Sequence, residues 1–277
     1  MGSPVQGYKE YDSVNAVAKE VWTRMPVFVR RFLHSTQADL LARRSQNQQV
    51  GVAKNRNWQK YFSDQLSGTG LEIGALHQPM LTHDRMQVDY IDRLTTAELR
   101  LQYPELNELP LVEPNLIGDG ETLANVADDS YDFLIASHVI EHMKNPLGSL
   151  EQWCRVVKPG GKVYLAIPDK RATFDVNRAR TSLAHLILDY QRPSADRDYE
   201  HYLDYANLVN HTSGDEAIAE ADRLWAIDYS IHFHVFVPED ITELVNWFSA
   251  HVAPVKILTG PVMNAGSHEF HMLLQVD

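Results

Sequence analysis

Six residues of this sequence, SHVIEH at 137–142, could do chemistry in two different ways. His138, Glu141 and His142 match the spacing H-x-x-E-H, in which two histidines bind a zinc ion and a glutamate assists hydrolysis. The same letters could instead form the loop that follows a buried strand, where an α/β enzyme holds a small ligand. A zinc hydrolase needs both histidines on one face of a long helix, whereas the sequence KNP ends any helix at about Asn145. The loop is therefore the favoured interpretation.

A second pair of histidines, His232 and His234, is separated by a single residue in a stretch expected to be extended. Alternate residues of an extended segment share a face, so these imidazoles could bind a divalent metal together with a carboxylate. One of them could instead remove a proton from an acceptor, and His234 is the candidate for that role. Packing inside the protein is the more common explanation for such a pair, so no metal ligand is assigned from the sequence.

The composition is that of an ordinary globular protein, here of 277 residues. The 25 basic and 37 acidic side chains give a net charge of −12, which repels phosphate backbones, so we expect no nucleic-acid partner. The single cysteine, Cys154, cannot form an internal disulfide, which suits a reducing compartment and excludes a cysteine-based zinc site. No apolar run approaches the roughly 18 residues of a membrane span. We expect a cytoplasmic protein, and the sequence does not indicate its oligomeric state.

Short apolar runs alternate with helical patterns from residue 70 onward. Runs that are apolar throughout are typical of strands covered on both faces, as in a parallel sheet. Between the fourth and fifth runs, a helix over about 146–157 has a buried stripe that includes Cys154, and a later helix over 237–249 has Pro238 in its first turn. The expected strands are residues 71–74, 86–92, 115–119, 131–137 and 162–168, followed by an antiparallel pair at 254–263 and 268–276.

The chain is expected to divide into two parts. Residues 1–65 include an amphipathic helical pattern and are expected to form an N-terminal helical cap. Residues 66–277 are expected to form an α/β domain with a Rossmann-like central sheet, mostly parallel with a C-terminal antiparallel hairpin and with helices on both faces. Residues 171–231 break the alternation with a long stretch rich in Tyr, Asp, Arg and His. We expect this stretch to be an insertion after the fifth strand that acts as a lid or substrate wall.

The order of these elements and their motifs resembles a class I S-adenosylmethionine-dependent methyltransferase. The most specific stretch, residues 119–168, runs from a strand end at DG through SHVIEH and a helix to PGG and a strand that ends in IP. The resemblance extends from about residue 70 to the end, and it leaves out the first 65 residues and the insertion. It implies S-adenosylmethionine as the cofactor, bound beyond the carboxyl ends of the parallel strands near the point where strand order reverses.

At the first strand end, the resemblance implies that Glu72 receives the amino group of the cofactor and that Gly74 lets the backbone approach its methionine portion. The usual glycine-rich loop is absent, because ALHQP follows Gly74. A cofactor without phosphates tolerates fewer glycines, and the missing glycines argue against a dinucleotide site. Asp92 ends the second strand, where a carboxylate can accept both hydroxyl hydrogens of a ribose.

At the next two strand ends, the resemblance implies contacts with the adenine and with the rest of the cofactor. Asp119 would accept a hydrogen bond from the exocyclic amine, and the backbone of Gly120 would contact a ring nitrogen. Ser137 and His138 would pack on the cofactor, whereas His142 would face the acceptor. His142 is therefore the first candidate for a general base.

The resemblance implies transfer of a methyl group to an oxygen or nitrogen of a small molecule, such as a sugar or a natural-product intermediate. The acidic composition and the lid-like insertion favour such an acceptor. Two alternatives stay open, namely a binding module that keeps the cofactor without turnover and a metal-dependent hydrolase that uses H-x-x-E-H. A nicotinamide-dependent oxidoreductase ranks lowest, because the sequence has no glycine-rich phosphate loop.

Overall fold

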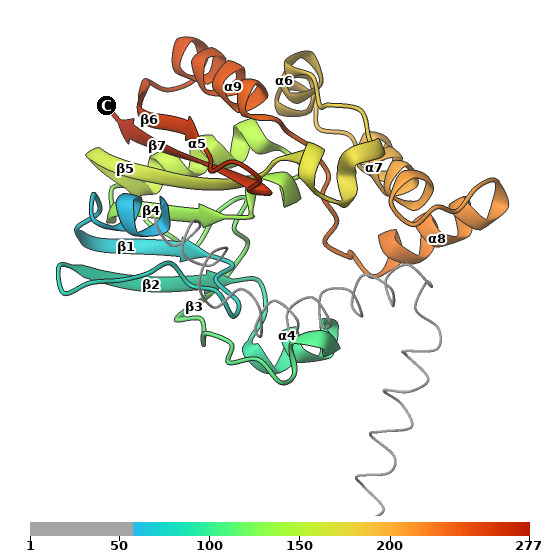
Figure 1. Ribbon diagram of the computed structural model, residues 1–277, viewed down its shortest axis with the longest axis horizontal. Helices are drawn as coiled ribbons and strands as arrows, with labels where there is room; N and C mark the ends of the chain where they lie inside the picture. The colour runs from blue at the N-terminus through green and yellow to red at the C-terminus, as the bar shows by residue number, and fades with distance from the viewer. Residues whose placement is uncertain (1–57) are drawn as a thin grey trace, which may run out of the picture.

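The computed structural model describes residues 58–277 (Figure 1). The helices expected within residues 11–45, and with them most of the expected N-terminal cap, lie outside the described residues. Of that cap, residues 58–63 are helical, and they pack against the sheet through Phe62, which is fully buried.

A seven-stranded sheet forms the centre of the fold, in the order β3-β2-β1-β4-β5-β7-β6. The strands are β1 (Gly68–Ile73), β2 (Met86–Asp92), β3 (Leu116–Ile117), β4 (Tyr131–Ser137), β5 (Val157–Pro168), β6 (Val255–Val262) and β7 (Glu269–Val276). The first five are parallel to one another, and β7 is antiparallel to both of its neighbours, β5 and β6. The expected fold class is therefore confirmed. Strand order reverses at β1, which lies between β2 and β4.

Three strands differ by more than two residues from the expectation drawn from the sequence. The first begins at Gly68, three residues before the expected start. The third strand has only the residues Leu116–Ile117. The fifth begins earlier than expected, because Val157 already pairs with Tyr131 across an irregularity in the register. The chain thus passes from helix directly into strand at KPGG. Gly161 suits this bend, since a Cβ atom there would lie 2.7 Å from the carbonyl oxygen of Asp132.

Helices lie on both faces of the sheet and beyond the edge where the parallel strands end (Figure 1). The α-helices are α4 (Thr96–Gln102), α5 (Pro146–Val156), α6 (Leu183–Gln191), α7 (Ala195–Leu208), α8 (Asp215–Ala226) and α9 (Pro238–His251). The short 3₁₀ helices are η1 (Pro104–Leu106), η2 (Ile140–His142), η3 (Lys170–Ala172) and η4 (Phe174–Asn177). Among the described helices, none combines the length and the apolar character that a membrane crossing requires.

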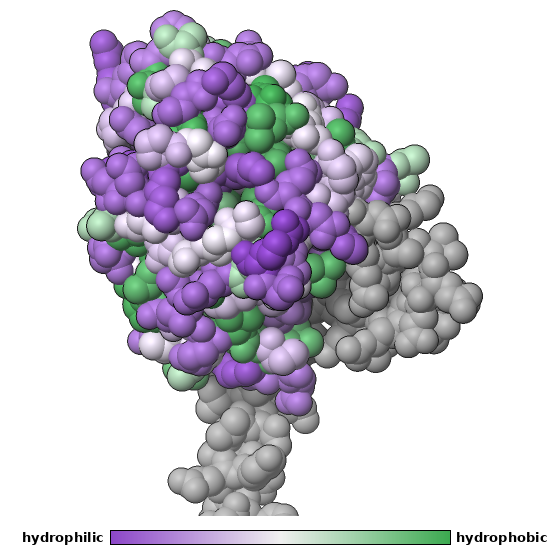
Figure 2. Space-filling view, turned by 90° about the vertical axis from the view of Figure 1, so that its left-hand side faces the viewer, coloured by the Kyte–Doolittle hydropathy of each residue, from purple (hydrophilic) through white to green (hydrophobic). Residues whose placement is uncertain are grey.

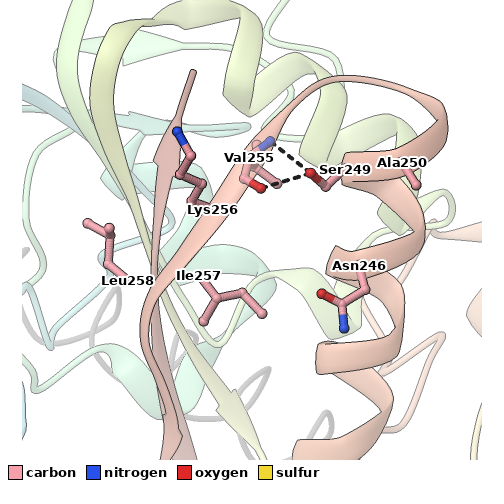
Figure 3. Close-up of a pocket in the computed structure, with 7 residues that line it drawn as sticks. All are labelled: Asn246, Ser249, Ala250, Val255, Lys256, Ile257 and Leu258. Atoms are coloured by element: carbon pink, nitrogen blue, oxygen red, sulfur yellow. Dashed lines mark hydrogen bonds between the residues drawn. The ribbon is translucent and has the colours of Figure 1, made fainter.

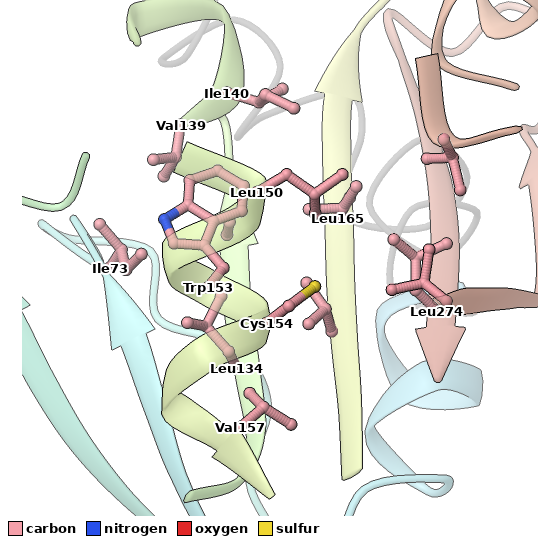
Figure 4. Packing of buried hydrophobic residues seen from close by; sticks show 14 of the residues in the cluster. Ile73, Leu134, Val139, Ile140, Leu150, Trp153, Cys154, Val157, Leu165 and Leu274 are labelled. Atoms are coloured by element: carbon pink, nitrogen blue, oxygen red, sulfur yellow. The ribbon is translucent and has the colours of Figure 1, made fainter. Parts of the chain in front are cut away.

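The main hydrophobic core lies between one face of the sheet and helices α5, α6 and α9. Figure 4 shows Leu150, Trp153 and Cys154 of α5 against Leu134 and Leu165 of the sheet. Full burial of each such large side chain contributes about 1.5–3 kcal/mol to stability. Burial raises the pKa of the Cys154 thiol to about 12, so this side chain is a neutral core residue, as the sequence predicts.

Residues 171–231 form helices α6, α7 and α8, of which α7 and α8 extend from the edge where the parallel strands end (Figure 1). The two helices pack on each other and on the segment before α9 through a separate hydrophobic cluster, which includes Tyr202, Ala221, Leu224 and Phe233. The insertion thus has its own small core beside the carboxyl ends of the strands.

Candidate functional site

A pocket of about 650 Å³ lies beyond the carboxyl ends of β1, β2 and β4, where strand order reverses. Open parallel sheets bind their ligands at this place. The loops after the strands form one wall, and residues of α4, α7 and the segment between α8 and α9 form the others. Six of the residues expected from the sequence line it: Gly74, Asp92, Asp119, Gly120, His138 and His142.

Three expected residues, Glu72, Ser137 and His234, are not part of the pocket lining. Because side chains alternate along a strand, Glu72 points to the sheet face opposite the main core. Its Oε1 accepts a hydrogen bond from the backbone N–H of Met80 at 2.9 Å, and burial raises the pKa of its carboxyl to about 7. In the structure, the Glu72 carboxylate hydrogen-bonds the loop after β1. A contact between Glu72 and the amino group of the cofactor stays a prediction.

Asp92 places a half-buried carboxylate in the pocket at the end of β2. Burial raises the pKa of this carboxyl, and hydrogen bonds from the backbone N–H groups of Leu94 and Arg93 partly oppose that rise. The backbone carbonyl of Asp92 accepts from the N–H of Gly118 at 2.9 Å, which ties this strand end to the residues after β3. A carboxylate fixed in this way can accept hydrogen bonds from the two hydroxyl groups of a ribose.

The residues after β3 form the adjacent part of the wall. Oδ1 of Asp119 accepts a hydrogen bond from the N–H of Glu121 at 2.7 Å. Gly120 packs so closely against Ile73 that a Cβ atom would lie 2.6 Å from its Cγ2, and the Gly120 carbonyl accepts from the indole of Trp153 at 2.8 Å. Only glycine therefore fits at this point without a shift of its neighbours.

Glu121 lines the pocket although the sequence analysis does not assign it a role. Its Oε2 accepts a hydrogen bond from the N–H of Lys144 at 2.7 Å, and burial raises the pKa of its carboxyl. Glu121 thereby joins the loop after β3 to the loop after β4. In the sequence, Glu121 directly follows the motif DG at residues 119–120, and this position could have marked it as a pocket residue.

Four lining residues have a left-handed backbone, Gly74 with a φ of 62°, His138 with a φ of 56°, Leu76 with a φ of 47° and Asp228 with a φ of 44°. Glycine adopts this conformation readily, whereas a residue with a side chain needs other contacts to hold it there. For His138 that contact comes from Glu269 of β7, whose Oε2 lies 2.7 Å from Nε2 of the imidazole. The hydrogen bond and the nearby carboxylate charges of Glu269 and Glu141 outweigh desolvation and raise the pKa of His138.

His142 lies in the pocket wall, and hydrogen bonds hold the Nδ1 atom of its ring in place. Its Nδ1 lies 2.9 Å from the backbone carbonyl oxygen of Ile231 and 3.1 Å from the hydroxyl of Ser230. A carbonyl oxygen only accepts, so Nδ1 carries the proton and Nε2 carries the lone pair. Burial lowers the pKa of His142 to about 3, and the ring is therefore neutral near pH 7. This is the tautomer that a general base at Nε2 requires.

His232 and His234, expected from the sequence to share a face, take part in two different clusters. Nδ1 of His232 lies 2.6 Å from Oδ2 of Asp175, and its ring lies against that of His142 with centroids 4.7 Å apart. His234 is fully buried and has its nearest imidazole neighbour, His201, in α7. The sequence analysis does not identify the carboxylate of Asp175, because it lies 57 residues away along the chain.

A second hollow lies between α9 and the edge strand β6, away from the carboxyl ends of the parallel strands (Figure 3). Two of its polar side chains are already paired, since the hydroxyl of Ser249 donates to the carbonyl of Val255 at 2.8 Å and Nζ of Lys256 lies 2.6 Å from a carboxylate oxygen of Asp277. Figure 2 shows the side toward which the amino ends of the parallel strands point, where hydrophilic residues predominate and hydrophobic ones form separate patches. The chemistry-bearing residues therefore gather at the carboxyl ends.

Comparison with known families agrees with this placement. Residues 65–165 match a protein-family model described as a methyltransferase domain, and they include the loops after β1, β2, β3 and β4 that form the pocket. Residues 65–165 thus form an S-adenosylmethionine-dependent methyltransferase domain. The match to this family model implies S-adenosylmethionine as the cofactor. The sheet has the strand arrangement of the class I fold. Comparison with curated proteins gives no match.

Solved structures of similar architecture include three methyltransferases of low sequence identity. The CurJ carbon methyltransferase is 15% identical with a TM-score of 0.43, and the match covers 80% of this chain and 54% of that one, so this chain spans about half of its length. A SAM-dependent methyltransferase from Aquifex aeolicus is 14% identical, with a TM-score of 0.43 and coverage of 81% and 90%. A possible histamine N-methyltransferase from Thermotoga maritima is 14% identical, with a TM-score of 0.44 and coverage of 88% and 97%.

Proposed function

We propose that the protein transfers the methyl group of S-adenosylmethionine to an oxygen or nitrogen of a small molecule, such as a sugar or a natural-product intermediate. One observation carries this proposal. The wall that presents the carboxylates of Asp92 and Asp119 also presents His142, whose Nε2 is free to accept a proton. A cofactor site and a candidate base thus lie in one pocket.

The residues expected to bind the cofactor fit a nucleoside without phosphates. We assign the ribose hydroxyls to Asp92, the adenine to Asp119 and Gly120, and the methionine portion to Gly74 and the adjacent loop. No arginine or lysine fork is needed at this position, because the ligand carries no phosphate. S-adenosylmethionine supplies an activated methyl group on a positively charged sulfur, so the protein mainly has to orient the acceptor and exclude water.

His142 is the proposed general base. For a hydroxyl acceptor, Nε2 of His142 takes the proton that the oxygen loses as it bonds to the methyl carbon. The low pKa makes His142 a weak base, but it keeps the ring ready to accept a proton throughout the neutral range. An amine acceptor needs less assistance, since a neutral amine is already nucleophilic. His234, the second candidate, does not reach the pocket lining, so we leave it out of this step.

The size and walls of the pocket support a small acceptor. Residues 171–231 contribute Tyr202, Asp228 and Tyr229 to the lining, and the hydroxyl of Tyr202 donates to the carbonyl of Tyr229 at 3.1 Å. This side therefore combines aromatic surface with a few polar groups, as small-molecule sites do. We propose that residues 171–231 act as the substrate-binding insertion of a domain that spans 66–277. The net charge of −12 argues against a nucleic-acid acceptor.

A methyl-transfer assay tests the proposal. The full-length protein would be incubated with S-adenosylmethionine that carries an isotopic label on the methyl group, and with sugars, nucleotide sugars, phenolic compounds and small amines. Formation of S-adenosylhomocysteine together with a labelled acceptor in the sugar, phenol or amine set is the expected result. Tight binding of S-adenosylhomocysteine without labelled product in any set would contradict the proposal and indicate a binding module.

A further inference from the structure

Three histidines and one aspartate outside the pocket gather at a single point: His185, Asp189, His201 and His234. The first two lie one helical turn apart on α6, the third lies on α7, and the fourth lies in the extended segment before α9. Their candidate ligand atoms all lie within 4.8 Å of one another. We propose that these four side chains bind one zinc ion, which fastens residues 171–231 to the methyltransferase domain.

The distances between the side chains fit tetrahedral coordination. Zinc binds imidazole nitrogen and carboxylate oxygen at about 2.0–2.2 Å, so tetrahedral ligand atoms lie about 3.3–3.6 Å apart. Nε2 of His185 lies 3.2 Å from Nε2 of His201 and 3.0 Å from Oδ2 of Asp189. Nε2 of His234 lies 4.0 Å from the same Oδ2 and 3.3 Å from the carbonyl oxygen of Lys144, a hydrogen bond that zinc binding at this nitrogen would replace. Shifts of less than an ångström would therefore bring these atoms to ligand distances.

The orientation of the rings agrees with this arrangement. The three ring centroids are 5.1 Å apart for His185 and His201, 5.6 Å for His185 and His234, and 4.8 Å for His201 and His234. Imidazoles bound end-on to one tetrahedral ion would have centroids about 5 Å apart. The interplanar angles are 87°, 67° and 75° in the same order, so the rings surround a point and do not stack on each other.

Hydrogen bonding within the cluster does not satisfy its buried polar atoms. Nδ1 of His234 is buried and has no hydrogen-bond partner among residues 58–277, whereas Nε2 of the same ring contacts the Lys144 carbonyl. Oδ2 of Asp189 is also buried, and Nε2 of His185 lies 3.0 Å from it. The other aspartate oxygen, Oδ1, accepts from Nε of Arg197 at 2.7 Å, which holds the carboxylate in place and leaves Oδ2 turned toward the imidazoles. Metal-binding carboxylates are commonly oriented by a hydrogen bond of this kind.

The chemistry of the ligands favours zinc among the divalent ions. Imidazole is a preferred ligand of zinc, whereas magnesium and calcium prefer sites made entirely of oxygen. Four protein ligands would fill a tetrahedral shell and leave no position for substrate, which is typical of a structural ion. The backbone N–H of His234 donates to the carbonyl of Glu141 at 3.1 Å, so the ion would lock α6 and α7 to the loop that carries His142.

Metal analysis of the full-length protein, expressed without a polyhistidine tag and purified without chelators, tests this inference. We expect about one zinc per chain in the wild type. After removal of the metal, competition with a chromophoric chelator should show zinc binding that is weakened more than about 100-fold in His201→Gln and in Asp189→Asn. His251→Gln, which alters an exposed histidine of α9, and His268→Gln, which alters a different histidine cluster, should bind zinc as the wild type does.

A spectroscopic test does not depend on the variants folding. Cobalt(II) added to the metal-free wild-type protein should give the intense visible absorption of a tetrahedral site, and zinc should abolish it. Zinc affinity that is the same in the wild type and His201→Gln would overturn the inference, and so would cobalt(II) bound without tetrahedral absorption. Loss of zinc in His268→Gln but not in His201→Gln would overturn it as well, by placing the ion elsewhere.

Discussion

Nδ1 of His142 lies 2.9 Å from the carbonyl oxygen of Ile231, and this contact decides which nitrogen of the ring carries a proton. The carbonyl can only accept, so the N–H is at Nδ1 and the lone pair is at Nε2. Ile231 is the last residue of the insertion, whereas His142 ends the 3₁₀ helix η2 in the loop after β4. The insertion therefore sets the tautomer of the residue that we propose as the general base.

Replacement of His142 by Gln should reduce turnover with a hydroxyl acceptor by about 10²–10⁴-fold, because a general base contributes an effect of that size. Binding of S-adenosylhomocysteine should change little, because the residues assigned to the cofactor stay in place. Single-turnover kinetics and calorimetric titration would measure the two quantities. His251→Gln is the matched control. Equal rates for His142→Gln and the wild type would exclude His142 as the base.

The pH dependence of turnover should show no protonation of His142 in the neutral range. Burial lowers the pKa of His142 to about 3, so the ring stays in its base form as the pH falls from 8 to 5. Any acidic limb of kcat/KM in this range should therefore arise from other groups and should also appear in the residual activity of His142→Gln. A limb near pH 6.5 that is present in the wild type and absent in the variant would contradict this account.

Replacement of Asp92 by Asn should weaken binding of S-adenosylhomocysteine by about 10–100-fold. A hydrogen bond to a charged group contributes about 1.5–3 kcal/mol, and the amide keeps only one acceptor oxygen for the ribose hydroxyls. Calorimetric titration of the purified variants would give the dissociation constants. Asp84→Asn is the control, because the Asp84 side chain is 98% exposed. If Asp92→Asn bound S-adenosylhomocysteine as tightly as the wild type, Asp92 would not be the residue that binds the ribose hydroxyls.

Replacement of Glu72 by Gln should stabilise the cofactor-free protein more at pH 8 than at pH 5. Burial raises the folded-state pKa of Glu72 from 4.5 to about 7, so the folded state binds the proton more tightly than the unfolded state. Wild-type stability is therefore lost as the pH rises from about 4.5 to 7, and Gln removes this loss while it keeps an acceptor for Met80. The difference in unfolding free energy between the two proteins should grow by about 2 kcal/mol over this range.

Urea unfolding of the wild type and Glu72→Gln at the two pH values would measure that change. A difference in unfolding free energy that stays constant between pH 5 and pH 8 would show that Glu72 ionises in the folded protein as freely as in the unfolded chain.

The sheet could be predicted from the sequence because strands such as β4 are largely apolar and end at recognisable turns. That pattern brings Asp92 at the end of β2 together with Asp119 and His142 in the loops after β3 and β4, since the carboxyl ends of parallel strands meet at one edge. The expected roles of these residues come from the family resemblance. The pairing at KPGG could not be predicted, because it depends on how Val157 meets the neighbouring strand across an irregular register.

Contacts made by the insertion could not be predicted from the sequence. His232 and His234 lie two residues apart, yet one contacts Asp175 and the other lies with His185 and His201. The packing of three helices decides these partners, and no local pattern in the sequence encodes it. Glu72 illustrates a related limit, since the pleat of β1 turns its side chain toward Met80 and away from the pocket lining.

If one pocket at the carboxyl ends of the parallel strands holds the cofactor beside His142, a crystal structure with S-adenosylhomocysteine will show it there. We expect the ribose hydroxyls within hydrogen-bonding distance of the Asp92 carboxylate, the adenine beside Asp119 and Gly120, and the sulfur facing the part of the pocket lined by His142. S-adenosylhomocysteine bound at another surface, or in this pocket with its sulfur turned away from His142, would contradict this arrangement.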